Sequence, residues 1–241
     1  MKLTHRIGIV TGAAQGIGAA TVARMAAEGA QVIACDKRLP EAGVPGACWS
    51  VVLDVTDAQA VKAVVGEVLK RYGRIDFLAN NAGITQDARL QKMTLEQFDA
   101  VIDVNLRGVF LCSQAVADTM VAQGSGVILN ASSVVGIYGN FGQTNYAASK
   151  FGVIGFTKTW SRELGPKGIR VNAVAPGPVW TPLNPADKPA EKVKTFGADT
   201  PMKRAAQPEE IAPAFVFLAA PSCSSYITGE ILPIIGGYSG G

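Results

Sequence analysis

Metal ligands and disulfide partners are scarce in this 241-residue chain, which has one histidine and four cysteines. Protein metal sites commonly draw histidine or cysteine ligands at short spacings. The single histidine, His5, precedes the first apolar run, and the cysteines show no such spacing: Cys35, Cys48, Cys112 and Cys223. We expect no metal site, and we expect reduced, mostly buried thiols.

Long apolar runs and runs of one charge are also missing. No run approaches the roughly 20 apolar residues that span a bilayer, and the segment Ile7–Val10 is too short for the core of a signal peptide. The 22 basic and 19 acidic residues are scattered and give a net charge of +3. We therefore expect a cytoplasmic protein that binds neither membrane nor nucleic acid.

Short apolar runs alternate with amphipathic segments along the whole chain. Strands are expected at Ile7–Thr11, Gln31–Asp36, Trp49–Asp54, Phe77–Asn80, Gly126–Asn130, Arg170–Ala175 and Glu230–Ile234. Helices are expected at Gly16–Glu28, Ala58–Tyr72, Leu95–Gln123, Tyr146–Leu164 and Glu209–Ala219. This alternation predicts an α/β fold, in which one Rossmann-like domain over residues 1–241 has a doubly wound parallel sheet with helices on both faces.

One segment departs from this pattern. Residues 182–204 are rich in proline, carry mixed charges and show little periodicity. Long irregular segments in compact domains are commonly lids over a binding site. We expect a substrate lid here, with a plain surface excursion as the alternative.

A glycine-rich turn follows the first expected strand. In the sequence Thr11–Gly18, Gly12 permits a tight bend, Gly16 lets the backbone approach a pyrophosphate, and Gly18 permits close packing of the next helix. The start of that helix, with Gln15 and Ile17, offers N–H groups and a positive dipole end to phosphate. A strand, a glycine turn and a helix in this order predict a dinucleotide site.

The second expected strand ends at Asp36, about twenty residues after the glycine turn. A carboxylate there can accept both ribose hydroxyls of NAD and repels the 2′-phosphate of NADP. Lys37 and Arg38 follow directly, and either could reach a 2′-phosphate if Asp36 turned away. We expect NAD as the cofactor, and NADP is not excluded.

Tyr146 and Lys150 are spaced one helical turn apart on one helix face. A nearby ammonium favours the phenolate and so lowers the tyrosine pKa toward the working pH. Ser133 follows another expected strand, and its hydroxyl could polarise a substrate carbonyl. The three residues predict acid/base chemistry on an alcohol or carbonyl, with Tyr146 as the proton carrier.

Together these motifs resemble those of the short-chain dehydrogenases/reductases over essentially the whole chain. The positions that carry the resemblance, in the family's order and spacing, are Thr11–Gly18, Asn80–Gly83, Asn105, Ser133, Tyr146 with Lys150, and Pro176–Gly177. The resemblance implies an NAD(P)-dependent oxidoreductase that transfers a hydride between the nicotinamide and a small-molecule alcohol or carbonyl.

The resemblance also implies a role for each residue. Tyr146 would exchange a proton with the carbonyl oxygen that Ser133 holds, while Lys150 would lower the tyrosine pKa and bind the ribose. Asn105 would lie in a locally disturbed helix and hold a water that relays protons to Lys150. The remaining cofactor contacts would be Asp54 and Val55 at the adenine, Asn81, Ala82 and Gly83 at the adenosine ribose, and Pro176, Gly177, Val179 and Thr181 at the nicotinamide.

Within the family, the segment Gly142–Tyr146 is most similar to 3-oxoacyl-thioester reductases. Two departures argue against a dedicated acyl-carrier-protein substrate: the turn at 122–126 lacks basic residues, and Asp36 suits NAD. An NAD-dependent dehydrogenase of small alcohols or sugars is the alternative. A non-catalytic nucleotide-binding regulator is a more distant alternative, because the catalytic set is complete.

Two expected helical segments, Val109–Met120 and Phe151–Thr159, are apolar on every side. A helix without a polar face is buried against something. Members of the family pack these helices against copies from a partner, so we expect a homo-oligomer, most simply a tetramer. Burial within the chain is the alternative.

Overall fold

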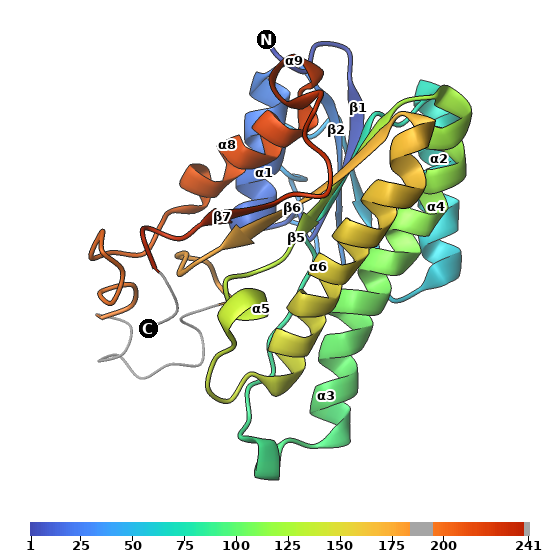
Figure 1. Ribbon diagram of the computed structural model, residues 1–241. Coiled ribbons are helices and arrows are strands. Elements are labelled where there is room, and N and C mark those ends of the chain that lie inside the picture. The colour runs from blue at the N-terminus through green and yellow to red at the C-terminus, as the bar shows by residue number, and fades with distance from the viewer. Residues whose placement is uncertain (184–194, 239–241) are drawn as a thin grey trace.

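The computed structural model describes residues 1–183 and 195–238, and these form one sheet with helices on both sides (Figure 1). The seven strands are β1 (Ile7–Thr11), β2 (Gln31–Asp36), β3 (Trp49–Val52), β4 (Phe77–Asn80), β5 (Gly126–Ala131), β6 (Ile169–Pro176) and β7 (Ile231–Ile234). All pairs are parallel, in the order β3-β2-β1-β4-β5-β6-β7. The predicted doubly wound fold is confirmed.

Helices cover both faces of the sheet, as Figure 1 shows. The longer helices are α1 (Gly16–Ala27), α2 (Ala58–Tyr72), α3 (Leu95–Ile102), α4 (Gly108–Gln123), α6 (Thr144–Leu164) and α8 (Pro208–Ala219). The short ones are η1 (Leu90–Lys92), η2 (Asp103–Arg107), α5 (Val135–Tyr138), η3 (Gly165–Lys167) and α9 (Pro221–Ser224). Helices α1 and α8 pack on one face, and α2, α4 and α6 lie on the other.

Side-chain alternation along the strands produces two hydrophobic cores. In β1, Val10 belongs to the core beneath α1 and α8, whereas Ile9 belongs to the core beneath α2 and α4. The β2 neighbours Val32 and Ile33 divide in the same way. Because helices cover both faces of the sheet, its strands are nearly continuous apolar runs in the sequence. This is why they could be recognised from the sequence alone.

Two predicted elements need correction. The expected strand Trp49–Asp54 ends at Val52, because the Asp54 carboxylate accepts hydrogen bonds from the Thr56 backbone and hydroxyl and closes a turn before α2. The expected helix Leu95–Gln123 is three consecutive pieces, since one π-helical turn, η2, separates α3 from α4. All four cysteines are free thiols, as expected, but only Cys35 and Cys112 are buried, whereas Cys48 is exposed and Cys223 is partly exposed.

By length and composition, Leu95–Gln123 could cross a membrane, and it is the one such stretch among the described residues. In the fold, α4 packs against α2, β4 and β5. Helix α4 therefore has the position of a core helix in an α/β fold. Core helices can meet the same criteria of length and composition as membrane-spanning helices.

Candidate active site

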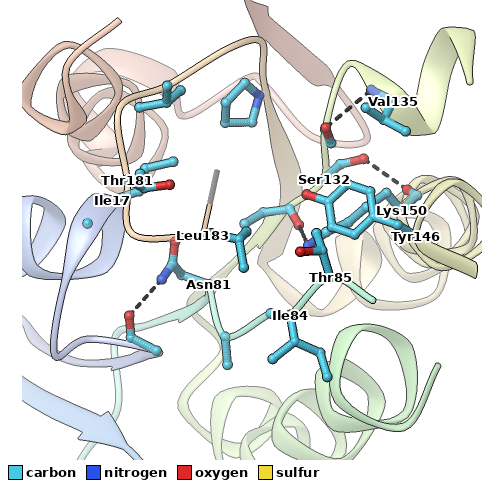
Figure 2. Close-up of a pocket in the computed structure, with 18 of the residues that line it drawn as sticks. Ile17, Asn81, Ile84, Thr85, Ser132, Val135, Tyr146, Lys150, Thr181 and Leu183 are labelled. Atoms are coloured by element: carbon cyan, nitrogen blue, oxygen red, sulfur yellow. Dashed lines mark hydrogen bonds between the residues drawn. The ribbon is translucent and has the colours of Figure 1, made fainter. Parts of the chain in front are cut away.

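A cavity of about 910 Å³ runs along the carboxyl ends of the strands. It spans the point where the strand order reverses, between β1 and β4, which is where doubly wound sheets bind ligands. Figure 2 shows Tyr146 and Lys150 entering it from α6, while Ile17 and Thr181 lie on the opposite side. The cavity therefore brings together loops that are far apart in the sequence.

Most predicted site residues line this cavity, and only Gly18 and Asn105 do not. Those that line it are Gly12, Gln15, Gly16, Ile17, Asp36, Asp54, Val55, Asn81, Ala82, Gly83, Ser133, Tyr146, Lys150, Pro176, Gly177, Val179 and Thr181. Of the predicted lid, residues 184–194 fall outside the described part of the chain, while Pro182, Leu183 and Phe196 line the cavity.

The glycine turn between β1 and α1 has the geometry that its sequence predicts. Gly12 has a φ of +62°, in the left-handed region that other residues rarely adopt. A Cβ at Gly18 would clash with the Gly12 carbonyl oxygen, so only glycine lets the helix pack this closely. No side chain caps the start of α1 at Gln15, which leaves this helix end to a ligand.

Asn81 holds the glycine turn in place from the neighbouring strand β4. Its Nδ2 donates to the carbonyl oxygens of Thr11 at 3.2 Å and Gly12 at 2.9 Å. The backbone N–H groups of Asn81 and Ala82 donate to the Thr11 hydroxyl at 3.1 and 3.2 Å. The supporting role implied for this motif is thus present as a set of hydrogen bonds.

Asp36, at the end of β2, is oriented by two backbone donors. Its Oδ2 accepts from Ala14 N–H at 3.0 Å, within the glycine turn, and its Oδ1 accepts from Arg38 N–H at 3.1 Å. Lys37 instead pairs with Asp54, at 2.7 Å between Nζ and Oδ2. The hydrogen bond from Lys37 lowers the pKa of Asp54 to about 2.

The predicted catalytic residues meet at the other end of the cavity. Lys150 is 3% exposed, and its Nζ donates to the Ala131 carbonyl oxygen at 2.8 Å. This Nζ lies 5.6 Å from the centroid of the Tyr146 ring. Ser133 follows β5, where its hydroxyl accepts from Val135 N–H at 3.2 Å.

The pKa values of this group differ from the sequence expectation. Burial raises the pKa of Tyr146 to about 12, a hydrogen bond with Ser133 acts in the opposite direction, and Asp87 raises it further. Burial also lowers the pKa of Lys150 to about 8. The expected lowering of the tyrosine pKa by Lys150 is therefore absent, because desolvation dominates for both groups and Nζ bonds to Ala131 and not to the phenol.

Asn105 lies in the π-helical turn η2, so the predicted helix disturbance is confirmed. Its side chain is fully buried and clamps the Ile84 backbone: Oδ1 accepts from the N–H at 2.8 Å and Nδ2 donates to the carbonyl at 3.0 Å. Nδ2 also lies 3.3 Å from the Ser149 hydroxyl. These contacts fix the loop after β4 against α6, one residue from Lys150.

Sequence reasoning missed two cavity residues close to Tyr146. Asp87 and Gln143 both line the cavity and hydrogen-bond to each other, although they are 56 residues apart. A partial signal existed, because Asp87 follows the Asn80–Gly83 motif and Gln143 precedes Tyr146 by three residues, directly before α6. Their pairing depends on how the loop after β4 folds back, which single-residue patterns do not reveal.

The chain is similar to known reductases and dehydrogenases over nearly its whole length. A family model described as enoyl-(acyl carrier protein) reductase matches residues 12–239. A 3-oxoacyl-(acyl-carrier-protein) reductase of Thermotoga maritima is 52% identical over 98% of this chain and 99% of its own length. A 3alpha-hydroxysteroid dehydrogenase of Mediterraneibacter gnavus is 41% identical, over 98% of both chains. Levodione reductase, as a crystal structure, superposes with a TM-score of 0.92 at 38% identity and 98% coverage of both chains.

The fold and the site define a nucleotide-binding oxidoreductase. The chain belongs to the short-chain dehydrogenase/reductase family, as the family model and these relatives show. The family implies a nicotinamide cofactor, and the residues present fit one. A Cβ at Gly12 or Gly18 would clash, and no side chain caps the N-terminal end of α1. Asp36 lines the cavity beside this helix end.

Proposed function

We propose that this enzyme reduces 3-oxoacyl thioesters to 3-hydroxyacyl thioesters with NADH, in the cytoplasm. The observation that carries the proposal is the convergence of Ser133, Tyr146 and Lys150 at the end of a cavity whose other end is the glycine turn. The 52% identity to a 3-oxoacyl-(acyl-carrier-protein) reductase supports the thioester substrate.

In the proposed mechanism, Tyr146 is the proton donor. Its pKa of about 12 keeps the phenol protonated at neutral pH, so it can pass a proton to the carbonyl oxygen during reduction. The Ser133 hydroxyl would hold and polarise that oxygen. The nicotinamide, when bound, supplies the hydride.

Lys150 and the cavity walls have positioning roles in this proposal. Lys150 would bind the nicotinamide ribose, with its ammonium held in place by the Ala131 carbonyl. Pro176, Gly177, Val179 and Thr181 would line the nicotinamide, and Asp54 and Val55 the adenine. Asn105 fixes the loop after β4, and the water relay to Lys150 remains part of the proposal.

The preference for NAD is supported by how the charges at the end of β2 are arranged. Asp36 lines the cavity with both carboxylate oxygens oriented by backbone N–H groups. Lys37 is paired with Asp54, and Arg38 is not among the residues that line the cavity. A 2′-phosphate would therefore meet a fixed carboxylate.

A second candidate is a dehydrogenase of small secondary alcohols. The likeness to levodione reductase and to a hydroxysteroid dehydrogenase favours it, because neither name refers to an acyl carrier. The turn at 122–126, without basic residues, also favours it over an acyl-carrier substrate.

The test is NADH and NADPH oxidation by the purified protein with an acetoacetyl thioester, simple ketones and cyclic ketones. Turnover of the thioester with NADH supports the first proposal. Turnover of ketones alone assigns the enzyme to the second candidate, and binding of NADH without turnover of any carbonyl contradicts both.

A further inference from the structure

The substrate end of the cavity contains a carboxylate that the proposed reaction does not use. Asp87 lies in the loop after β4 and lines the cavity together with Tyr146. It is solvent-exposed, and both of its oxygens accept hydrogen bonds from Gln143 Nε2, at 3.1 and 3.0 Å. Gln143 is the residue before α6, and it lines the same cavity as Asp87 and Tyr146, so the carboxylate is held at the cavity wall near the start of α6.

The Asp87 loop is fixed to the start of α6 by contacts on both sides of Asp87. Ala88 N–H donates to the Gly142 carbonyl oxygen at 2.9 Å. The fully buried Asn145 donates from Nδ2 to the carbonyl oxygens of Gln86 at 3.0 Å and Gln97 at 2.9 Å. The position of the carboxylate is thus built into the fold and does not depend on its own hydrogen bond alone.

Several charged or titratable groups besides Asp36, Lys37 and Asp54 line the cavity. They are Lys150 on α6, Asp87 after β4, Asp103 in η2, Asp199 in the segment before α8, Tyr238 near the carboxyl terminus, and Tyr146 itself. Asp87 is the carboxylate that raises the pKa of Tyr146. The Lys150 ammonium is directed to the Ala131 carbonyl, so it does not pair with Asp87 in this arrangement.

We propose that Asp87, positioned by Gln143, selects substrates that are uncharged beside the reacting carbonyl and disfavours those with a carboxylate there. This inference rests on the proposed reductase function and deepens it. A 3-oxoacyl thioester or ester is neutral where a free 3-oxo acid carries a negative charge, and that charge would be repelled by Asp87 at the cavity wall. The same carboxylate favours the protonated phenol that reduction requires.

The test compares Asp87→Asn with the parent enzyme, using NADH with ethyl acetoacetate and with acetoacetate. Asparagine keeps the shape and can still accept from Gln143, so only the charge is removed. We expect the kcat/KM preference for the ester over the acid to fall about threefold to tenfold, and to fall less at high salt. Asp99→Asn, on exposed α3 outside the cavity, is the matched control and should leave the preference unchanged.

A second measurement does not depend on turnover. The phenolate absorbance of Tyr146 is obtained by subtracting the alkaline titration of Tyr146→Phe from that of the parent, and the same subtraction is made in the Asp87→Asn background. We expect the Tyr146 pKa to fall by roughly half a unit when the charge is removed. An unchanged ester preference or an unchanged phenol pKa overturns the inference. Absence of any carbonyl turnover, with the pKa shift present, contradicts the proposed function instead.

Discussion

At the scale of single residues, the proposed preference for NAD rests on the end of β2. The backbone N–H groups of Ala14 and Arg38 hold Asp36 in place, and Lys37 is paired with Asp54 at 2.7 Å. The proposed preference for NAD thus rests on one carboxylate, because Lys37 is paired with Asp54 and Arg38 does not line the cavity.

Replacing Asp36 with alanine should raise the kcat/KM ratio of NADPH to NADH by about tenfold or more, since the repulsion of a 2′-phosphate disappears. Steady-state kinetics with both cofactors measure this ratio. Lys37→Ala is the matched comparison: it should change the ratio little, because Lys37 pairs with Asp54. An unchanged ratio in Asp36→Ala would assign cofactor choice to another residue.

Lys150 should give the stability a distinct pH dependence. Burial lowers its pKa from 10.5 to about 8, so between these values the unfolded chain holds more protons than the folded one. The free energy of unfolding therefore rises with pH in this window, by about 1 to 2 kcal/mol from about pH 8 to about pH 9.5.

Denaturant unfolding at several pH values, with Lys150→Met as the reference, measures this effect. The buried thiols of Cys35 and Cys112, whose pKa values are raised by burial, act in the opposite direction in both proteins. The difference between the two proteins therefore isolates Lys150. If the two pH profiles run parallel, Lys150 is not desolvated to this extent.

At the scale of elements, the turn between β1 and α1 is stabilised by the neighbouring strand. Replacing Asn81 with alanine removes the donors to Thr11 and Gly12, which leaves two carbonyl groups without these hydrogen bonds. We expect a loss of about 1 to 3 kcal/mol of stability and about tenfold weaker NADH binding. Thermal unfolding and NADH fluorescence titration measure the two effects, and unchanged NADH affinity would show that the turn holds its shape without Asn81.

Element boundaries were predictable where the local sequence determines them. Strands β1, β2 and β4 and helix α2 have the predicted bounds, because each is a continuous apolar or periodic run between turn residues. The interruption of α3 and α4 at Asp103–Arg107 came only from the family resemblance, since a π-helical turn leaves no break in the apolar pattern. The pKa values of Tyr146 and Lys150 were not predictable, because burial depends on the tertiary fold.

The candidate site could likewise be predicted only in part from the sequence. The glycine turn, Ser133, Tyr146 and Lys150 were found because each belongs to a motif with fixed spacing. Asp87 and Gln143 were not, because their contact joins a loop after β4 to the start of α6. Contacts between distant segments require the structure.

At the scale of the whole molecule, α4 and α6 carry a group of aromatic side chains that is partly exposed. Phe156 stacks on Trp160 at 4.5 Å between ring centroids and lies 6.5 Å from Phe110. Phe110 is 39% exposed and Phe151 is 64% exposed. Because exposed apolar residues in one region commonly mark an interface, we propose that this region joins copies of the chain into a tetramer.

Phe151→Glu should shift the assembly toward smaller species, because it places a charge in the proposed interface. Sedimentation velocity over a range of protein concentrations measures the assembly state. Val52→Glu, an exposed position on the edge strand β3, is the control and should not change it. A parent protein that sediments as a monomer would contradict the proposed assembly.

The most direct test of the central claim is single-turnover oxidation of NADH by an acetoacetyl thioester in the parent enzyme and in Tyr146→Phe. The account predicts that the variant binds NADH with unchanged affinity but transfers hydride at least about a hundredfold more slowly, since the proton donor is gone. Undiminished hydride transfer in Tyr146→Phe would contradict the assignment of Tyr146 as the acid.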